Sequence, residues 1–78
     1  MQKNVVIKGV VDEVYTKFSK NHNEQFKVIT IDNKRLFCES KIFDTIDEFD
    51  ILECYEFECI PSPKENIFGV KKIQKVYS

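Results

Sequence analysis

In parts of the chain, hydrophobic and polar positions alternate with the period of two that is typical of β-strands. The segment 5–14 is apolar on both faces in its first half, which predicts a strand covered on two sides, and Gly9 in its middle predicts a bend. The segment 17–25 is polar and has no periodicity, so it predicts a flexible loop. This loop would carry Lys17, Lys20 and His22.

The segment 26–39 has the pattern of a β-hairpin. With Asn33 and Lys34 as a two-residue turn, Thr30 lies opposite Phe37, although Lys34 is a poor substitute for the glycine that such a turn prefers. The alternation then sorts the side chains onto two faces. The predicted core face carries Ile29, Ile31, Leu36 and Cys38, and the predicted outer face carries Phe26, Val28, Thr30, Arg35, Phe37 and Glu39.

A helical spacing follows the hairpin. A short helix or helical turn, with Ser40 as its N-cap, is predicted by the apolar positions Ile42, Phe43, Ile46 and Phe49. The segment 51–60 returns to alternation, and a change of parity at Cys54 and Tyr55 predicts a β-bulge. Prolines and polar residues predict a loop over 61–66, and we expect a last strand over 67–76.

The composition supports a single mainly β domain that spans 1–78. Valine and isoleucine, with 8 and 9 copies, far outnumber leucine, with 2, and this balance favours strands. The net charge of −1 excludes a polybasic protein that would hold nucleic acid by its global field. The segment 42–63 carries 7 acidic and no basic residues, whereas the rest carries 12 basic and 6 acidic ones, so we expect an acidic and a basic side.

Catalytic and metal chemistry have little support in the sequence. Cys38, Cys54 and Cys59 are an odd set without a Cys-x-x-Cys pair, and with a single histidine they lack the paired ligands of a zinc site. We expect them to be small apolar fillers in a reducing compartment. We therefore expect no enzymatic activity, no metal and no cofactor.

The N-terminal segment and the composition bear on location and origin. The N-terminal apolar stretch is interrupted by Lys8 and Asp12, so we expect no signal peptide or membrane span and a cytoplasmic protein. Eleven lysines against one arginine, together with nine isoleucines and no alanine, suggest AT-rich coding, as in many phages, plasmids and low-GC bacteria.

The order of the predicted elements is three strands, a short helical segment and two strands, with a bent first strand. The chain therefore resembles the OB-fold, a five-stranded, partly open barrel in which a helical segment often lies between strands three and four. The resemblance spans nearly the whole chain and rests on element order and on the spacing of Phe68, Val70, Ile73 and Val76. An SH3-like barrel is the alternative, and the helical stretch 42–49 argues against it.

The resemblance implies a ligand across the outer face of strands two and three, between the first long loop and the loop that joins strands four and five. Aromatic rings beside basic side chains suit single-stranded nucleic acid, because bases stack on the rings and ammonium groups follow the phosphates. No basic helix is expected that could enter the major groove of a duplex. The candidate binding residues are Lys17, Phe18, Lys20, Phe26, Arg35, Phe37, Lys64, Phe68, Lys71 and Lys72.

Two functions remain open at this point. The first is a non-enzymatic single-stranded DNA-binding module, accessory to replication, recombination or mobile-element maintenance, with RNA as a ligand that the sequence does not separate from DNA. The second is a protein-interaction domain, either a subunit or an inhibitor, that docks through the acidic region or through Phe26 and Phe37. The alternative interpretation of Phe18 and Phe68 is that they are simply core residues. One small domain offers a short footprint, so tight binding would need a homo-oligomer.

Overall fold

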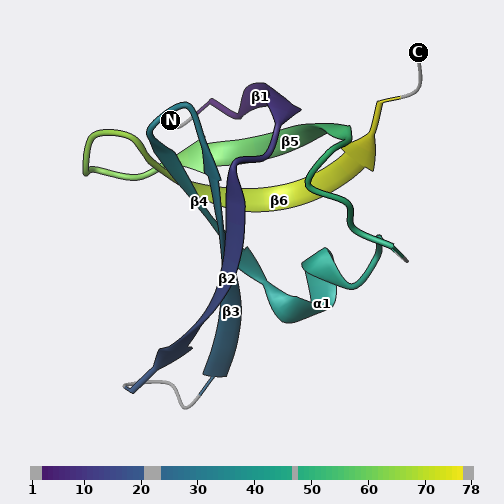
Figure 1. Ribbon diagram of the computed structural model, residues 1–78. Coiled ribbons are helices and arrows are strands. Elements are labelled where there is room, and N and C mark those ends of the chain that lie inside the picture. The colour runs from purple at the N-terminus through teal and green to yellow at the C-terminus, as the bar shows by residue number, and fades with distance from the viewer. Residues whose placement is uncertain (1–2, 21–23, 47, 77–78) are drawn as a thin grey trace.

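One mixed β-sheet and one helical turn make up the regular structure of the described residues, 3–20, 24–46 and 48–76, in this computed structural model (Figure 1). The elements are β1 (Val5–Val10), β2 (Glu13–Ser19), β3 (Glu24–Ile31), β4 (Lys34–Glu39), α1 (Ser40–Phe43), β5 (Cys54–Pro61) and β6 (Ile67–Lys75). The strand order is β1-β5-β6-β4-β3-β2. Neighbouring strands are antiparallel, apart from the parallel pair β4 and β6. The prediction of a mainly β domain is thus confirmed.

The connection 11–12 divides the predicted first strand in two. Asp12 ties the connection to the sheet, because its backbone N–H donates to the Thr30 carbonyl at 2.8 Å and its carboxylate accepts from the Asp32 N–H at 3.1 Å. The chain therefore changes direction there and not at Gly9, which stays within β1. As a result β1 and β2 are opposite edges of an open six-stranded sheet, where a five-stranded, partly open barrel was expected.

The turn of the β3–β4 hairpin is formed by Asp32 and Asn33, one residue earlier than predicted. Both residues have positive φ, 46° and 67°, a conformation that Asp and Asn tolerate much better than Lys34 would. Thr30 consequently lies opposite Arg35 and not opposite Phe37. Moving the turn by one residue shifts cross-strand partners by two positions, so every side chain keeps its predicted face.

The core lies on the inner face of the curved sheet. The predicted core residues of the hairpin are all buried there, which confirms the face assignment. The cluster consists of Val11, Ile29, Ile31, Leu36, Cys38, Tyr55, Phe57, Cys59, Val70 and Ile73. Phe68 packs against it and is half-buried, in agreement with its simpler role as a core residue.

The predicted helical segment is shorter than its apolar spacing suggested. α1 is a single turn that begins at Ser40, and Glu39 is its N-cap, whereas Ser40 donates its hydroxyl to the Gln25 carbonyl at 3.2 Å. The apolar spacing instead buries the connection to β5 against the core. Phe49 stacks on Tyr55 at 4.4 Å between ring centroids with only 7° between the planes.

Among the described residues, no helix has the length and apolar character needed to cross a membrane.

The predicted bulge at Cys54 and Tyr55 is absent, because β5 begins at Cys54 and alternates regularly from there. The parity change marks the start of the strand, since the preceding residues 51–53 form a turn. A register shift does occur opposite Glu58 and Cys59, where Lys71 is an extra residue on β6. Both Lys71 and Lys72 are exposed.

The polar stretch that predicted a flexible loop is largely a strand pair. β2 and β3 pair from Glu13 opposite Thr30 to Ser19 opposite Glu24, and they extend from the body as an arm (Figure 1). Most side chains of β2 are exposed to solvent, so the strand does not need the alternation that marks a buried face. Lys17 and Phe18 are therefore strand residues, and His22 lies outside the described residues.

Candidate nucleic-acid interface

The outer sides of β2, β3 and β4 form one surface, which we call the arm face. The strand registers arrange it as three cross-strand rows, because side chains directly opposite one another lie on the same side of a sheet. The rows are Glu13–Thr30–Arg35, Tyr15–Val28–Phe37 and Lys17–Phe26–Glu39. The register thus places Phe26, Arg35 and Phe37 together on the predicted outer face.

Phe26 and Phe37 are the aromatic centre of the arm face. Their ring centroids are 5.4 Å apart and their planes are tilted by 40°, a separation typical of favourable aromatic pairs. Lys17 Nζ lies 5.9 Å from the centroid of Phe37, at the outer limit of a cation–π contact. Val28 points to the same side and is fully buried, so its neighbours on this face must cover it. Both rings are accordingly half-buried and held in place.

A groove of about 700 Å³ opens beside the two rings. This volume is within the range of roughly 300 to 1,000 Å³ that small-molecule sites occupy. The groove is lined by Glu24, Gln25, Phe26, Phe37, Cys38, Glu39, Ser40 and Lys41. Its rim carries charges of both signs, and Lys41 Nζ forms an exposed ion pair with Glu39 at 3.3 Å.

Two residues of this site, Tyr15 and Glu39, were not among the candidates predicted from the sequence. Tyr15 shares a row with Phe37 and is 40% exposed, but the predicted first strand ended one residue before it. Glu39 lies directly opposite Phe26, whereas the predicted register placed Glu39 opposite Val28. The sequence did contain a signal for the correct register. A two-residue turn requires positive φ, and assigning the turn to Asp32 and Asn33 would have predicted the observed pairs.

Two other candidates on the arm lie away from the two rings. Phe18 pairs with Gln25, so it faces the opposite side of the arm from Phe26, and it is 53% exposed. It does not pack in the core, in contrast to its simpler interpretation. Lys20 is exposed and follows β2 directly.

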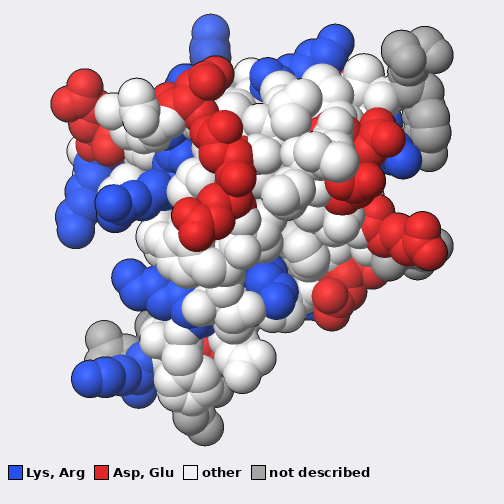
Figure 2. Space-filling view, viewed as in Figure 1, with Lys and Arg blue, Asp and Glu red and all other residues white. Residues whose placement is uncertain are grey.

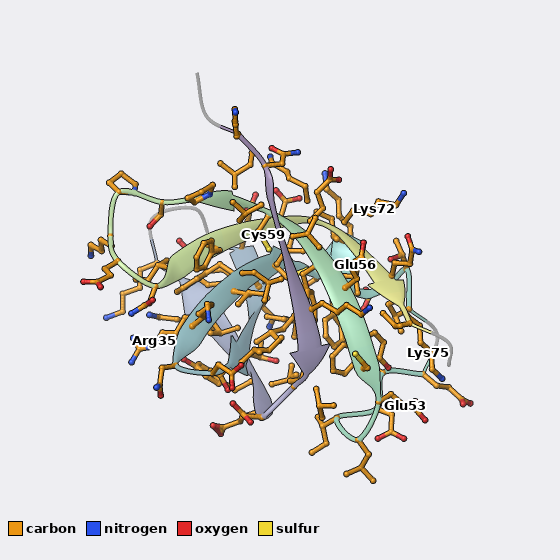
Figure 3. All side chains as sticks on the ribbon, turned by 90° about the horizontal axis from the view of Figure 1, so that it is seen from above. Arg35, Glu53, Glu56, Cys59, Lys72 and Lys75 are labelled. Atoms are coloured by element: carbon orange, nitrogen blue, oxygen red, sulfur yellow. The ribbon has the colours of Figure 1, made fainter. Side chains whose placement is uncertain are left out.

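The late candidates are separated from the groove. Lys64 is an exposed residue of the loop that joins β5 and β6. Lys72 lies opposite Glu58 on the outer side of β5 and β6. Figure 3 shows Arg35 and Lys72 on opposite sides of the molecule. None of the four late candidates, Lys64, Phe68, Lys71 and Lys72, is among the described residues that line the groove.

The surface charge is partly segregated on the side that Figure 2 shows. Lysine and arginine atoms lie mainly at the left and lower left, around the loop between β5 and β6, the β3–β4 hairpin and the arm, with a few more at the top, and acidic atoms gather at the right, around α1 and the segment after it. A further acidic stripe crosses the upper centre. The predicted acidic and basic sides therefore exist on this view only in part.

Two of the cysteines are buried thiols. Cys38 and Cys59 are 1% and 0% exposed, which agrees with their predicted role as apolar fillers. Burial, assisted by the neighbouring Cys59 thiol, raises the pKa of Cys38 to about 12, and burial raises the pKa of Cys59 to about 11. Both groups hence stay protonated near neutral pH and are poor nucleophiles. In the described part of the chain, no three His, Cys, Asp or Glu residues are grouped so that they could hold a metal ion.

Comparisons with protein-family models, with curated proteins and with solved structures gave no significant match.

Proposed function

We propose that this chain is a non-enzymatic OB-fold module that binds single-stranded DNA on its arm face, in an accessory role in DNA metabolism. The OB-fold part of the proposal is supported by connectivity. If β1 and β2 are counted as two halves of one bent strand, its first half pairs with β5 and its second half pairs with β3. Together with β6 and β4, which lie between β5 and β3, this would give the five strands of an OB-fold. The helical turn lies between β4 and β5, which would be strands three and four.

The observation that carries the binding proposal is the pair Phe26 and Phe37 on the outside of the sheet, with Lys17 above the second ring. Two outward aromatic rings provide a platform on which bases stack, at about 1 to 3 kcal/mol per base. A lysine beside the platform can follow the phosphates between successive bases. In the OB-fold, the face formed by strands two and three is the usual binding face, and in the proposed correspondence this is the outer face of β3 and β4.

The test is fluorescence anisotropy of a labelled oligo-dT strand titrated with the protein at roughly 50 and 200 mM salt. We expect the oligo-dT strand to bind, and its affinity to be lower at the higher salt concentration. Duplex DNA should bind less tightly than the single strand, because its bases are not available for stacking. A single-stranded RNA of matched length separates DNA from RNA. No binding of any strand at tens of micromolar protein would overturn the proposal.

A second candidate, docking on a partner protein, is favoured by one specific observation. Ile51 and Leu52 occupy the middle of a turn that is closed by a hydrogen bond from the Glu53 N–H to the Asp50 carbonyl at 3.1 Å. They are 47% and 82% exposed, although polar residues and glycine are the usual residues of turns. Tyr55 steadies the turn, because its hydroxyl accepts the Asp50 N–H at 2.9 Å. Two apolar side chains on an ordered acidic turn suit an apolar pocket with a basic rim.

This second candidate has its own test. Pull-downs with the wild type and with Leu52→Asp would be compared, with Val6→Asp as the control because Val6 is also a large exposed residue, at 59%. A protein partner that is lost only with Leu52→Asp would support docking through the turn. Equal loss with both variants would contradict it.

A further inference from the structure

We infer that the groove beside Phe26 and Phe37 selects guanine within a single strand, and that Glu39 is the residue that recognises it. The inference rests on the proposed function, because it assumes that a base stacks on these rings. The negative charge in the groove conflicts with binding a phosphate backbone there. Two of the side chains that line the groove, Glu24 and Glu39, carry negative charge, which repels a phosphate backbone.

The conflict disappears if the acidic side chain faces a base edge and not the backbone. Glu39 is the direct cross-strand neighbour of Phe26, and such neighbours have Cβ atoms about 4.5 to 5.5 Å apart. A base stacked at Phe26 would therefore present its edge, and not its phosphate, to the Glu39 carboxylate. Base edges are recognised in this way when single strands lie on aromatic platforms.

Guanine is the base whose edge matches a carboxylate. An ionised carboxylate has two acceptor oxygens and no donor. The Watson–Crick edge of guanine offers two adjacent donors, the ring N1–H and the exocyclic 2-amino group, so both oxygens can be used. Adenine and cytosine offer one amino donor beside an acceptor nitrogen, and thymine offers one N–H between two carbonyl oxygens. With those three bases, an acceptor would face an acceptor.

Lys41, the basic neighbour of Glu39, would also take part in binding. Its ammonium lies 3.3 Å from Glu39, but both side chains are largely exposed, so the ion pair contributes little and is easily exchanged. When guanine occupies the carboxylate, Lys41 becomes available for the phosphate of the same nucleotide. The groove would then bind base and phosphate with adjacent side chains.

The experiment compares labelled 12-residue strands of dT that carry one central substitution. The central residue is dT, dA, dC, dG or deoxyinosine, which differs from guanosine only in lacking the 2-amino group. A single guanine also avoids the folded structures of guanine-rich strands. We expect about tenfold tighter binding with dG than with dT, and most of this gain should be lost with deoxyinosine.

Protein variants assign the preference to a residue. Glu39→Gln keeps the shape of the side chain and removes one of its two acceptors, so the ratio of dG to dT affinity should fall towards one. Glu13→Gln is the matched control, because it removes an equal charge from the same face outside the groove. Glu13→Gln should raise affinity for every strand through reduced repulsion. Glu39→Gln should raise affinity for the dT strand in the same way but should lose the extra affinity for dG, so only Glu39→Gln should change the ratio.

The outcomes separate the two proposals. Failure of every strand to bind would overturn the proposed function and this inference with it. Binding without a difference between the strands would overturn only the guanine preference. A preference for dG that persists in Glu39→Gln would overturn the role of Glu39, and tighter binding of an RNA strand with a central guanine would overturn the assignment to DNA.

Discussion

The two outward sides of the sheet use charged residues in different ways. On the arm face, Lys17 lies over an aromatic ring beside a groove of about 700 Å³. The outer side of β1, β5 and β6, which we call the β5 face, instead has the rows Val6–Glu58–Lys72 and Lys8–Glu56–Gln74 around a hollow of about 160 Å³. Glu56 and Lys72 lie near one another on this side in Figure 3.

The comparison shows that the neighbours of a lysine decide what it can bind. Lys8 and Lys72 each have a glutamate directly opposite, so an incoming phosphate would meet a partly neutralised site. Lys17 has an aromatic neighbour, which attracts a cation without cancelling its charge. A nucleic-acid strand should therefore distinguish the two faces even though both carry lysines.

The largest expected effect is on the aromatic centre. Phe37→Ala should weaken oligo-dT binding by about 1 to 3 kcal/mol because a stacking ring is lost, whereas Val6→Ala on the β5 face should leave binding unchanged. Anisotropy titrations at a single salt concentration measure both changes. Phe37→Leu is the second variant, because it keeps an apolar side chain over the buried Val28 and removes only the ring. Full binding by Phe37→Leu would show that Phe37 acts through packing and not through stacking.

The sequence predicted the faces of this site better than its details. The two-residue period of the strands over 28–31 and 35–38 was sufficient to separate the two faces of the sheet, because a shift of two positions leaves the faces unchanged. It did not predict that Val28 is fully buried on the outer face. The position of Glu39 opposite Phe26 beside the groove was not predicted. That pairing follows from the position of the turn, in which Asp32 and Asn33 adopt positive φ. The late lysines were grouped with the rings only through the fold resemblance. Long-range pairing, such as that of β6 with β4, leaves no local signal in the sequence.

A smaller effect, of about 1 kcal/mol per thiol at pH 10, should come from the cysteines beneath the two faces, Cys38 in β4 and Cys59 in β5. The folded protein keeps protons that the unfolded chain releases near the ordinary pKa of 9.0, because burial raises the folded values to about 12 and about 11. Stability should therefore be complete below pH 9 and should fall as the pH rises from there towards 11 and 12. Urea unfolding at pH 8 and pH 10 measures this loss.

Substitution of each cysteine identifies its share of the stability that is lost at alkaline pH. Cys38→Val and Cys59→Val should each lose less stability between pH 8 and pH 10 than the wild type, whatever their stability at pH 8. The double variant should lose least. An unchanged difference between the two pH values in all three variants would contradict the account, because other titrating groups would then be responsible.

The smallest expected effect is the salt dependence of binding, which tests the comparison of the two faces directly. Each phosphate contact contributes about 0.7 to the slope of log affinity against log salt for a single strand. Lys17→Ala should reduce the slope by about this amount, since its ammonium lies beside the platform where bases stack. Lys72→Ala should leave the slope nearly unchanged, because Glu58 lies opposite it and the groove is on the other face. Titrations at four salt concentrations resolve the difference, and a reduction by Lys72→Ala as large as that by Lys17→Ala would mean that the strand continues across β6 onto the β5 face.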